Sequence, residues 1–62
     1  MPAVTINGPE ISLTKKRQLS ATITHALAKI YGLDKDTILI YINEYPTDAV
    51  AKGGKLIRDR QD

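Results

Sequence analysis

Few residues of this 62-residue chain combine the chemistry and the position that a catalytic site needs. The most promising is Pro2, because removal of Met1 would leave a proline at the free terminus, with a secondary amine in a rigid ring. A free α-amino group has a reference pKa of about 8, well below that of lysine. An apolar surrounding or a nearby cation lowers this pKa further, since either disfavours the ammonium form. Such an amine could accept and return a proton at neutral pH.

The other chemically interesting residues fit ordinary surface roles better. His25 lies in a helical stretch without a Ser or Cys partner in any motif, and Asp34 and Asp36 flank a turn, where acids are usually solvated. The "KGGK" stretch, residues 52–55, is too short for a phosphate loop. The basic cluster Lys15–Arg17 opposes the positive end of a helix dipole, which favours an anionic ligand there.

Length and composition point to a small oligomeric protein. A single core rarely stabilises a chain this short, and without Cys there is no disulfide to help. With one His and no Cys, we expect no metal site, so partner subunits are the expected source of stability. The net charge of +2 suits anionic small molecules and does not indicate nucleic acid. No apolar run could span a membrane and no signal peptide is evident; with the lack of Cys, this predicts a cytoplasmic protein.

The residues after Pro2 alternate as in a strand. Val4 and Ile6 share one face, Ala3, Thr5 and Asn7 share the other, and the Gly-Pro pair at residues 8–9 ends the strand.

The apolar period then changes to that of a helix over about residues 15–31. Ser12 or Thr14 can cap its start, and Gly32 can end it in the left-handed conformation. The predicted apolar stripe comprises Leu19, Ile23, Ala26, Leu27 and Ile30.

We expect a short turn of 3₁₀ type before a second strand over residues 37–45. The helix between the two strands makes them parallel, with a right-handed crossover. The isoleucines of residues 38–42 should pack on the helix, whereas the face with Thr5 and Tyr41 needs a neighbouring chain. Gly53–Gly54 predicts a small hairpin with arms at residues 49–52 and 55–57.

Together these features resemble the 4-oxalocrotonate tautomerase family. The resemblance rests on Pro2, the strand–helix–strand order, Glu44 at the end of the second strand and Gly53–Gly54 near the C-terminus. The stretch "NEYPTDAVAKGGKLIRDR" is similar to the C-terminal signature of short DmpI-type members, and "KKRQL" resembles the start of the family helix.

The resemblance implies a single tautomerase-like domain over residues 1–62, of α/β (α+β) class with a β-α-β fold and a small C-terminal hairpin. Two chains would share a four-stranded sheet, and three dimers would form a hexamer. Pro2 would act as general base and then acid, taking a proton from the 2-hydroxyl of a dienol such as 2-hydroxymuconate and returning it to carbon. No cofactor is needed for this transfer.

The chain departs from the family at the substrate-binding positions. The two family arginines that clamp carboxylates fall near Ile11 and on Leu39, and the aromatic wall residue falls on Val50. Lys16 is a candidate replacement cation, as are Arg17, Lys52, Arg58 and Arg60. We therefore expect weak activity on dicarboxylates, or a substrate with fewer charges.

Two alternatives stay open. The same fold could use Pro2 for hydration or dehalogenation of an unsaturated acid. Alternatively, the chain could be a non-catalytic oligomeric module whose basic rim binds an acidic partner.

Overall fold

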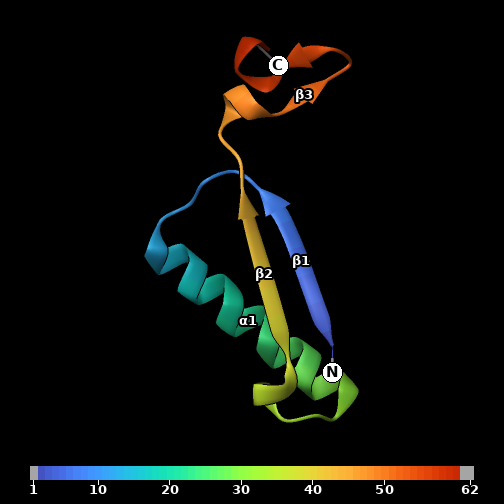
Figure 1. Ribbon diagram of the computed structural model, residues 1–62. Coiled ribbons are helices and arrows are strands. Elements are labelled where there is room, and N and C mark those ends of the chain that lie inside the picture. The colour runs from blue at the N-terminus through green and yellow to red at the C-terminus, as the bar shows by residue number, and fades with distance from the viewer. Residues whose placement is uncertain (1, 61–62) are drawn as a thin grey trace.

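The main unit of the chain is a helix packed beside two parallel strands (Figure 1). The computed structural model describes residues 2–60; Met1 and residues 61–62 lie outside this part. Strand β1 (Ala3–Gly8) and strand β2 (Leu39–Glu44) pair in register from Ala3 opposite Leu39 to Gly8 opposite Glu44. Helix α1 (Leu13–Tyr31) connects them, so the predicted parallel β-α-β arrangement is confirmed.

Helix α1 begins two residues earlier than predicted, because Ser12 rather than Thr14 is its N-cap. The Ser12 hydroxyl accepts a 3.2 Å hydrogen bond from the Lys15 N–H. At the other end, Gly32 has a φ of 70° and donates to the Ala28 carbonyl at 2.9 Å. The predicted left-handed glycine is therefore confirmed, and the 3₁₀ turn η1 (Lys35–Thr37) follows as expected.

The side chains of both strands alternate between a half-buried inner face and an exposed outer face. Among residues 2–60 only Ile38 is buried, with 8% of its surface exposed. The predicted helix stripe is partly wrong, since Ala26 is exposed and Ile30 is 81% exposed. Two strands about 5 Å apart form a sheet too narrow to cover the whole stripe.

The C-terminal segment stands beyond the ends of β1 and β2 (Figure 1). It contains the 3₁₀ turn η2 (Thr47–Ala49), the hairpin strands β3 (Ala51–Lys52) and β4 (Lys55–Leu56), and the 3₁₀ turn η3 (Ile57–Asp59). The predicted hairpin is present, but both arms are shorter than expected because η2 and η3 take up their outer residues.

The chain is extended for its length. Its radius of gyration is 15.0 Å, whereas a compact chain of 62 residues has a radius of about 11 Å. Its accessible surface is 5031 Å², against about 4,000 Å² for a compact protein of this mass. The described fold thus leaves large surfaces uncovered, and none of its helices is long and apolar enough to cross a membrane.

Candidate active site

Pro2 is tied to the start of β2 by a backbone hydrogen bond. The Leu39 N–H donates to the Pro2 carbonyl at 3.0 Å, which extends the parallel pairing one residue beyond Ala3. Pro2 is half-buried, and Leu39 is 37% exposed beside it. Two of the predicted site residues therefore lie together at this end of the sheet.

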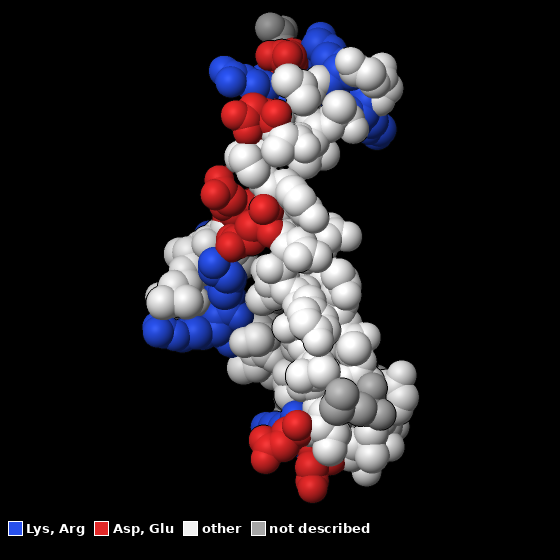
Figure 2. Space-filling model, viewed as in Figure 1, with Lys and Arg blue, Asp and Glu red and all other residues white. Residues whose placement is uncertain are grey.

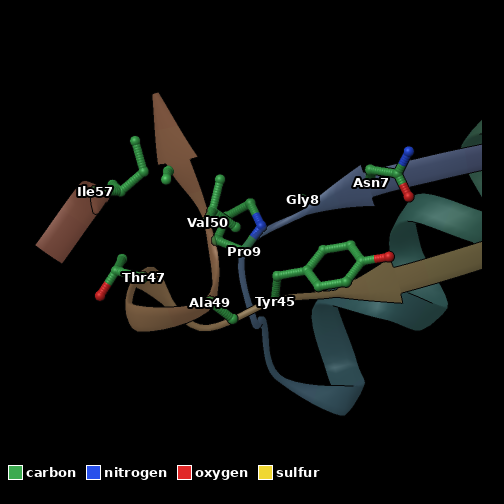
Figure 3. A pocket seen from close by; sticks show the side chains of 9 residues that line it. Asn7, Gly8, Pro9, Tyr45, Thr47, Ala49, Val50 and Ile57 are labelled. Carbon is green, nitrogen blue, oxygen red and sulfur yellow. The ribbon is translucent and has the colours of Figure 1, made fainter. Parts of the chain in front are cut away.

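A pocket of about 660 Å³ lies at the other end of the same strands, where they meet the C-terminal segment. Figure 3 shows the Asn7 amide and the Tyr45 ring toward one end, Pro9 and Val50 in the middle, and Ile57 toward the other end. A 2.8 Å hydrogen bond from the Ile57 N–H to the Val50 carbonyl holds two of these walls together. The full lining consists of Asn7, Gly8, Pro9, Tyr45, Thr47, Ala49, Val50, Ala51 and Ile57.

The length of β1 separates Pro2 from this pocket. Pro2 precedes the strand and Gly8, a pocket residue, ends it. Six residues of strand at about 3.3 Å each span about 20 Å. One chain therefore does not bring Pro2 and Val50 into one site.

Ile11 and Lys16 also lie at the pocket end, but both contact Glu44. The Lys16 ammonium is 2.6 Å from one Glu44 carboxylate oxygen, and the Ile11 N–H donates to the other at 2.8 Å. The hydrogen bond from Lys16, and next that from Ile11, lower the pKa of Glu44 below its usual value. These contacts join the start of α1 to the end of β2, and the positive charge of Lys16 is paired with the Glu44 carboxylate.

The remaining candidate cations lie at the start of α1 and in the C-terminal segment, and Figure 2 shows acidic atoms beside both groups. The Arg58 Nε is 4.0 Å from Asp59, and the Arg60 guanidinium donates to the Lys52 carbonyl at 3.4 Å. Lys52 itself faces Lys55 across the hairpin. None of these cations lines the pocket.

Sequence reasoning missed the polar side chains of the pocket. Asn7 accepts a 3.0 Å hydrogen bond from the Asn43 Nδ2, and Tyr45 follows directly after β2. The alternation of side chains in the sequence could have indicated this pair, because it places Asn7 and Asn43 on the outer faces of two paired strands. In residues 2–60, no group of three or more His, Cys, Asp or Glu side chains could hold a metal ion.

Comparison with known proteins agrees with this fold over nearly the whole chain. The profile of the family described as "Tautomerase enzyme" matches residues 2–60. A probable tautomerase of Bradyrhizobium diazoefficiens is 36% identical over 61 residues, covering 97% of this chain and 91% of that protein.

Solved structures give the same result. DmpI from Archaeoglobus fulgidus is 41% identical with a TM-score of 0.84, covering 94% of this chain and all of that one. YwhB, a homologue of 4-oxalocrotonate tautomerase, is 30% identical with a TM-score of 0.85, covering 97% of this chain and all of that one. The chain therefore belongs to the tautomerase family and is a tautomerase-type isomerase.

Proposed function

We propose that this chain is a keto–enol tautomerase that uses the amine of Pro2 as general base and acid. The substrate would be a small 2-hydroxy-dienoic or 2-oxo acid such as 2-hydroxymuconate. The observation that carries the proposal is the attachment of Pro2 to β2 through Leu39, which orients the ring of a residue that could present a secondary amine. Membership of the tautomerase family supports the same reaction type.

The reaction needs one proton carrier. The Pro2 nitrogen takes the proton of the 2-hydroxyl group, and the oxygen electron pair forms the keto C=O bond. The conjugated double bonds shift, and the same nitrogen returns the proton to a carbon of the system. Substrate and product have the same composition, and one nitrogen carries the proton in both directions, so the proposed step consumes no co-reactant.

We further propose that the site is completed by a second copy of the chain. Pro2 and the pocket lie at opposite ends of β1, so two chains side by side and antiparallel would bring the Pro2 of one near the pocket of the other. Among the described residues β1 and β2 form a two-stranded sheet with free edges, which such a side-by-side contact requires. The outer face, with Tyr41 54% exposed, is left for further chains to cover. Two such two-stranded sheets would make one four-stranded sheet, and three dimers a hexamer. Light scattering measures the mass of the assembly.

The test compares wild type with Pro2→Ala in the ketonisation of 2-hydroxymuconate and of phenylenolpyruvate, followed by ultraviolet absorbance. Pro2→Ala leaves a primary amine that the ring no longer holds in place, so we expect it to lose much of the about 10²–10⁴-fold that a positioned general base typically contributes. Pro46→Ala is the matched control, since Pro46 is exposed and its nitrogen is an amide that cannot act as a base.

Mass spectrometry of the wild-type protein must accompany these rates. If Met1 is retained, the Pro2 nitrogen is an amide and the preparation is inactive for that reason. Equal rates in processed wild type and Pro2→Ala would overturn the proposal. No ketonisation by a processed, assembled protein would overturn the tautomerase proposal and leave the two alternatives, hydration or dehalogenation of an unsaturated acid and a non-catalytic binding module.

A further inference from the structure

The outer face of the β1–β2 sheet carries a pair of amides beside the pocket. The Asn43 Nδ2 donates to the Asn7 Oδ1 at 3.0 Å, and the two residues are directly opposite each other in the strand register. This bond occupies the Asn7 oxygen and so orients its side chain. Within residues 2–60, the Asn7 Nδ2 and the Tyr45 hydroxyl donate no hydrogen bond, although both belong to residues that line the pocket.

Positive charge is missing from the pocket. No Lys, Arg or His belongs to its lining among the described residues. The ion pair of Lys16 and Glu44 is near in sequence, but Glu44 points to the inner face of β2 whereas Asn43 and Tyr45 belong to the outer alternation. Figure 2 likewise shows an uncharged surface along β1 and β2 between the charged groups.

We propose that Asn7, oriented by Asn43, is the residue that selects the substrate in this pocket. Its amide nitrogen donates to a carboxylate or keto oxygen of the substrate, and the Tyr45 hydroxyl is the second donor at the same end (Figure 3). Asn43 does not line the pocket and acts as a positioning residue. This inference rests on the proposed function and specifies the substrate of that reaction.

The substrate class follows from the remaining walls. Away from Asn7 and Tyr45 the pocket presents Pro9, Val50 and Ile57, with the Thr47 hydroxyl and no cation. A second carboxylate placed there would lose hydration without gaining an ionic partner, which is unfavourable. The pocket therefore prefers singly charged 2-oxo acids, or their enols, whose far end is uncharged, over dicarboxylates such as 2-hydroxymuconate.

Binding of unreactive probes tests the substrate class without turnover. (E)-Cinnamate carries one carboxylate and an apolar end, whereas (E,E)-muconate carries a carboxylate at each end. Titrated into the assembled protein and followed by calorimetry, cinnamate should bind with a Kd at least ten times lower than that of muconate. Equal or tighter binding of muconate would overturn the substrate class.

Substitutions at Asn43 test the role of Asn7 without altering a lining residue. Asn43→Asp offers only acceptors, so the Asn7 amide should turn, donate to the new carboxylate and present its oxygen to the pocket. We expect the Kd for cinnamate to rise about tenfold or more, because a hydrogen bond to a charged group is lost. Asn43→Thr retains a hydroxyl donor toward the Asn7 oxygen and should recover most of the affinity.

Two further measurements on Asn43→Asp distinguish a turned Asn7 amide from charge repulsion of the ligand or from misfolding. Repulsion by the new charge would be largely screened in 1 M salt, where the Debye length is about 3 Å, whereas a turned amide would not respond to salt. In turnover, Asn43→Asp should raise KM while kcat changes less than about threefold. Wild-type affinity in Asn43→Asp, or a weakening that high salt removes, would refute the role of Asn7.

The proposed function is judged separately. Pro2→Ala should lose turnover but keep cinnamate binding. If Pro2→Ala kept its turnover, the catalytic proposal would fail, and the probe titrations would still decide the role of Asn7.

Discussion

Mixing two inactive variants should restore activity. Pro2→Ala replaces the rigid secondary amine of the proposed base with a flexible primary amine, and Val50→Glu places a negative charge in the pocket, where it would repel an anionic substrate. If both residues served a site within one chain, no mixture could be active. Because β1 holds them about 20 Å apart, we expect each site to combine Pro2 from one chain with Val50 from another.

The size of the recovery follows from counting sites. In an isologous dimer with two sites, equal amounts of the two variants yield about half mixed dimers. Each mixed dimer contains one site with an intact Pro2 and an intact pocket, and one site with both changes. Recovered activity should therefore be about one quarter of that of wild type.

The assay follows ketonisation in mixtures refolded together from denaturant. Native mass spectrometry verifies that mixed oligomers have formed, and each variant refolded alone is the control. Verified mixed oligomers without activity would refute a site shared between chains. Activity in either variant alone would show that the substituted residue is not required.

The remaining predictions concern stability at fixed protein concentration, measured as urea midpoints. Because the pKa of Glu44 is lowered in the folded protein, its ion pair with Lys16 stabilises the fold at pH values above the usual carboxyl pKa of 4.5. This stabilisation is lost as the pH falls through the lowered pKa that Glu44 has in the folded protein. Glu44→Gln should therefore be less stable than wild type at pH 7, with a gap that closes below pH 4.5; a gap independent of pH would contradict the assignment. Gly32→Ala places a Cβ in open space at a φ of +70°, so strain alone should cost about 1 kcal/mol. Gly8→Ala also meets open space, without that φ, and should cost less; equal losses would refute the reasoning.

Local patterns were sufficient to predict most of the elements. The alternation in β1 and β2 and the Gly32 cap act within a few residues of sequence, and the structure confirms both. Of the two candidate N-caps, Ser12 and Thr14, the structure selects Ser12. The short hairpin was predicted from Gly53–Gly54, but its exact arms were not. The outer residues of each arm could form either strand or 3₁₀ turn, and sequence patterns do not distinguish these over three residues.

The contacts around the pocket could not be predicted in the same way. Lys16 was one of several candidate replacements for a missing arginine, yet its ammonium contacts Glu44, 28 residues further along the chain. Asn7 and Asn43 are 36 residues apart and meet because the parallel register places them opposite each other. Such pairs depend on strand register and on the side from which the helix packs.

The sequence alone determined the order of strand and helix, the parallel pairing, the Gly32 cap and the position of Pro2 just before β1. These features depend on backbone conformation and hydrophobic period, which act over short distances along the chain. The tertiary structure decided that Pro2 and Val50 lie at opposite ends of one strand, that Lys16 pairs with Glu44, and that Asn43 donates to Asn7. The reason is geometric, because the distance between residues that are far apart in sequence depends on the lengths of the strands and on their pairing register. Both are set only when the chain has folded.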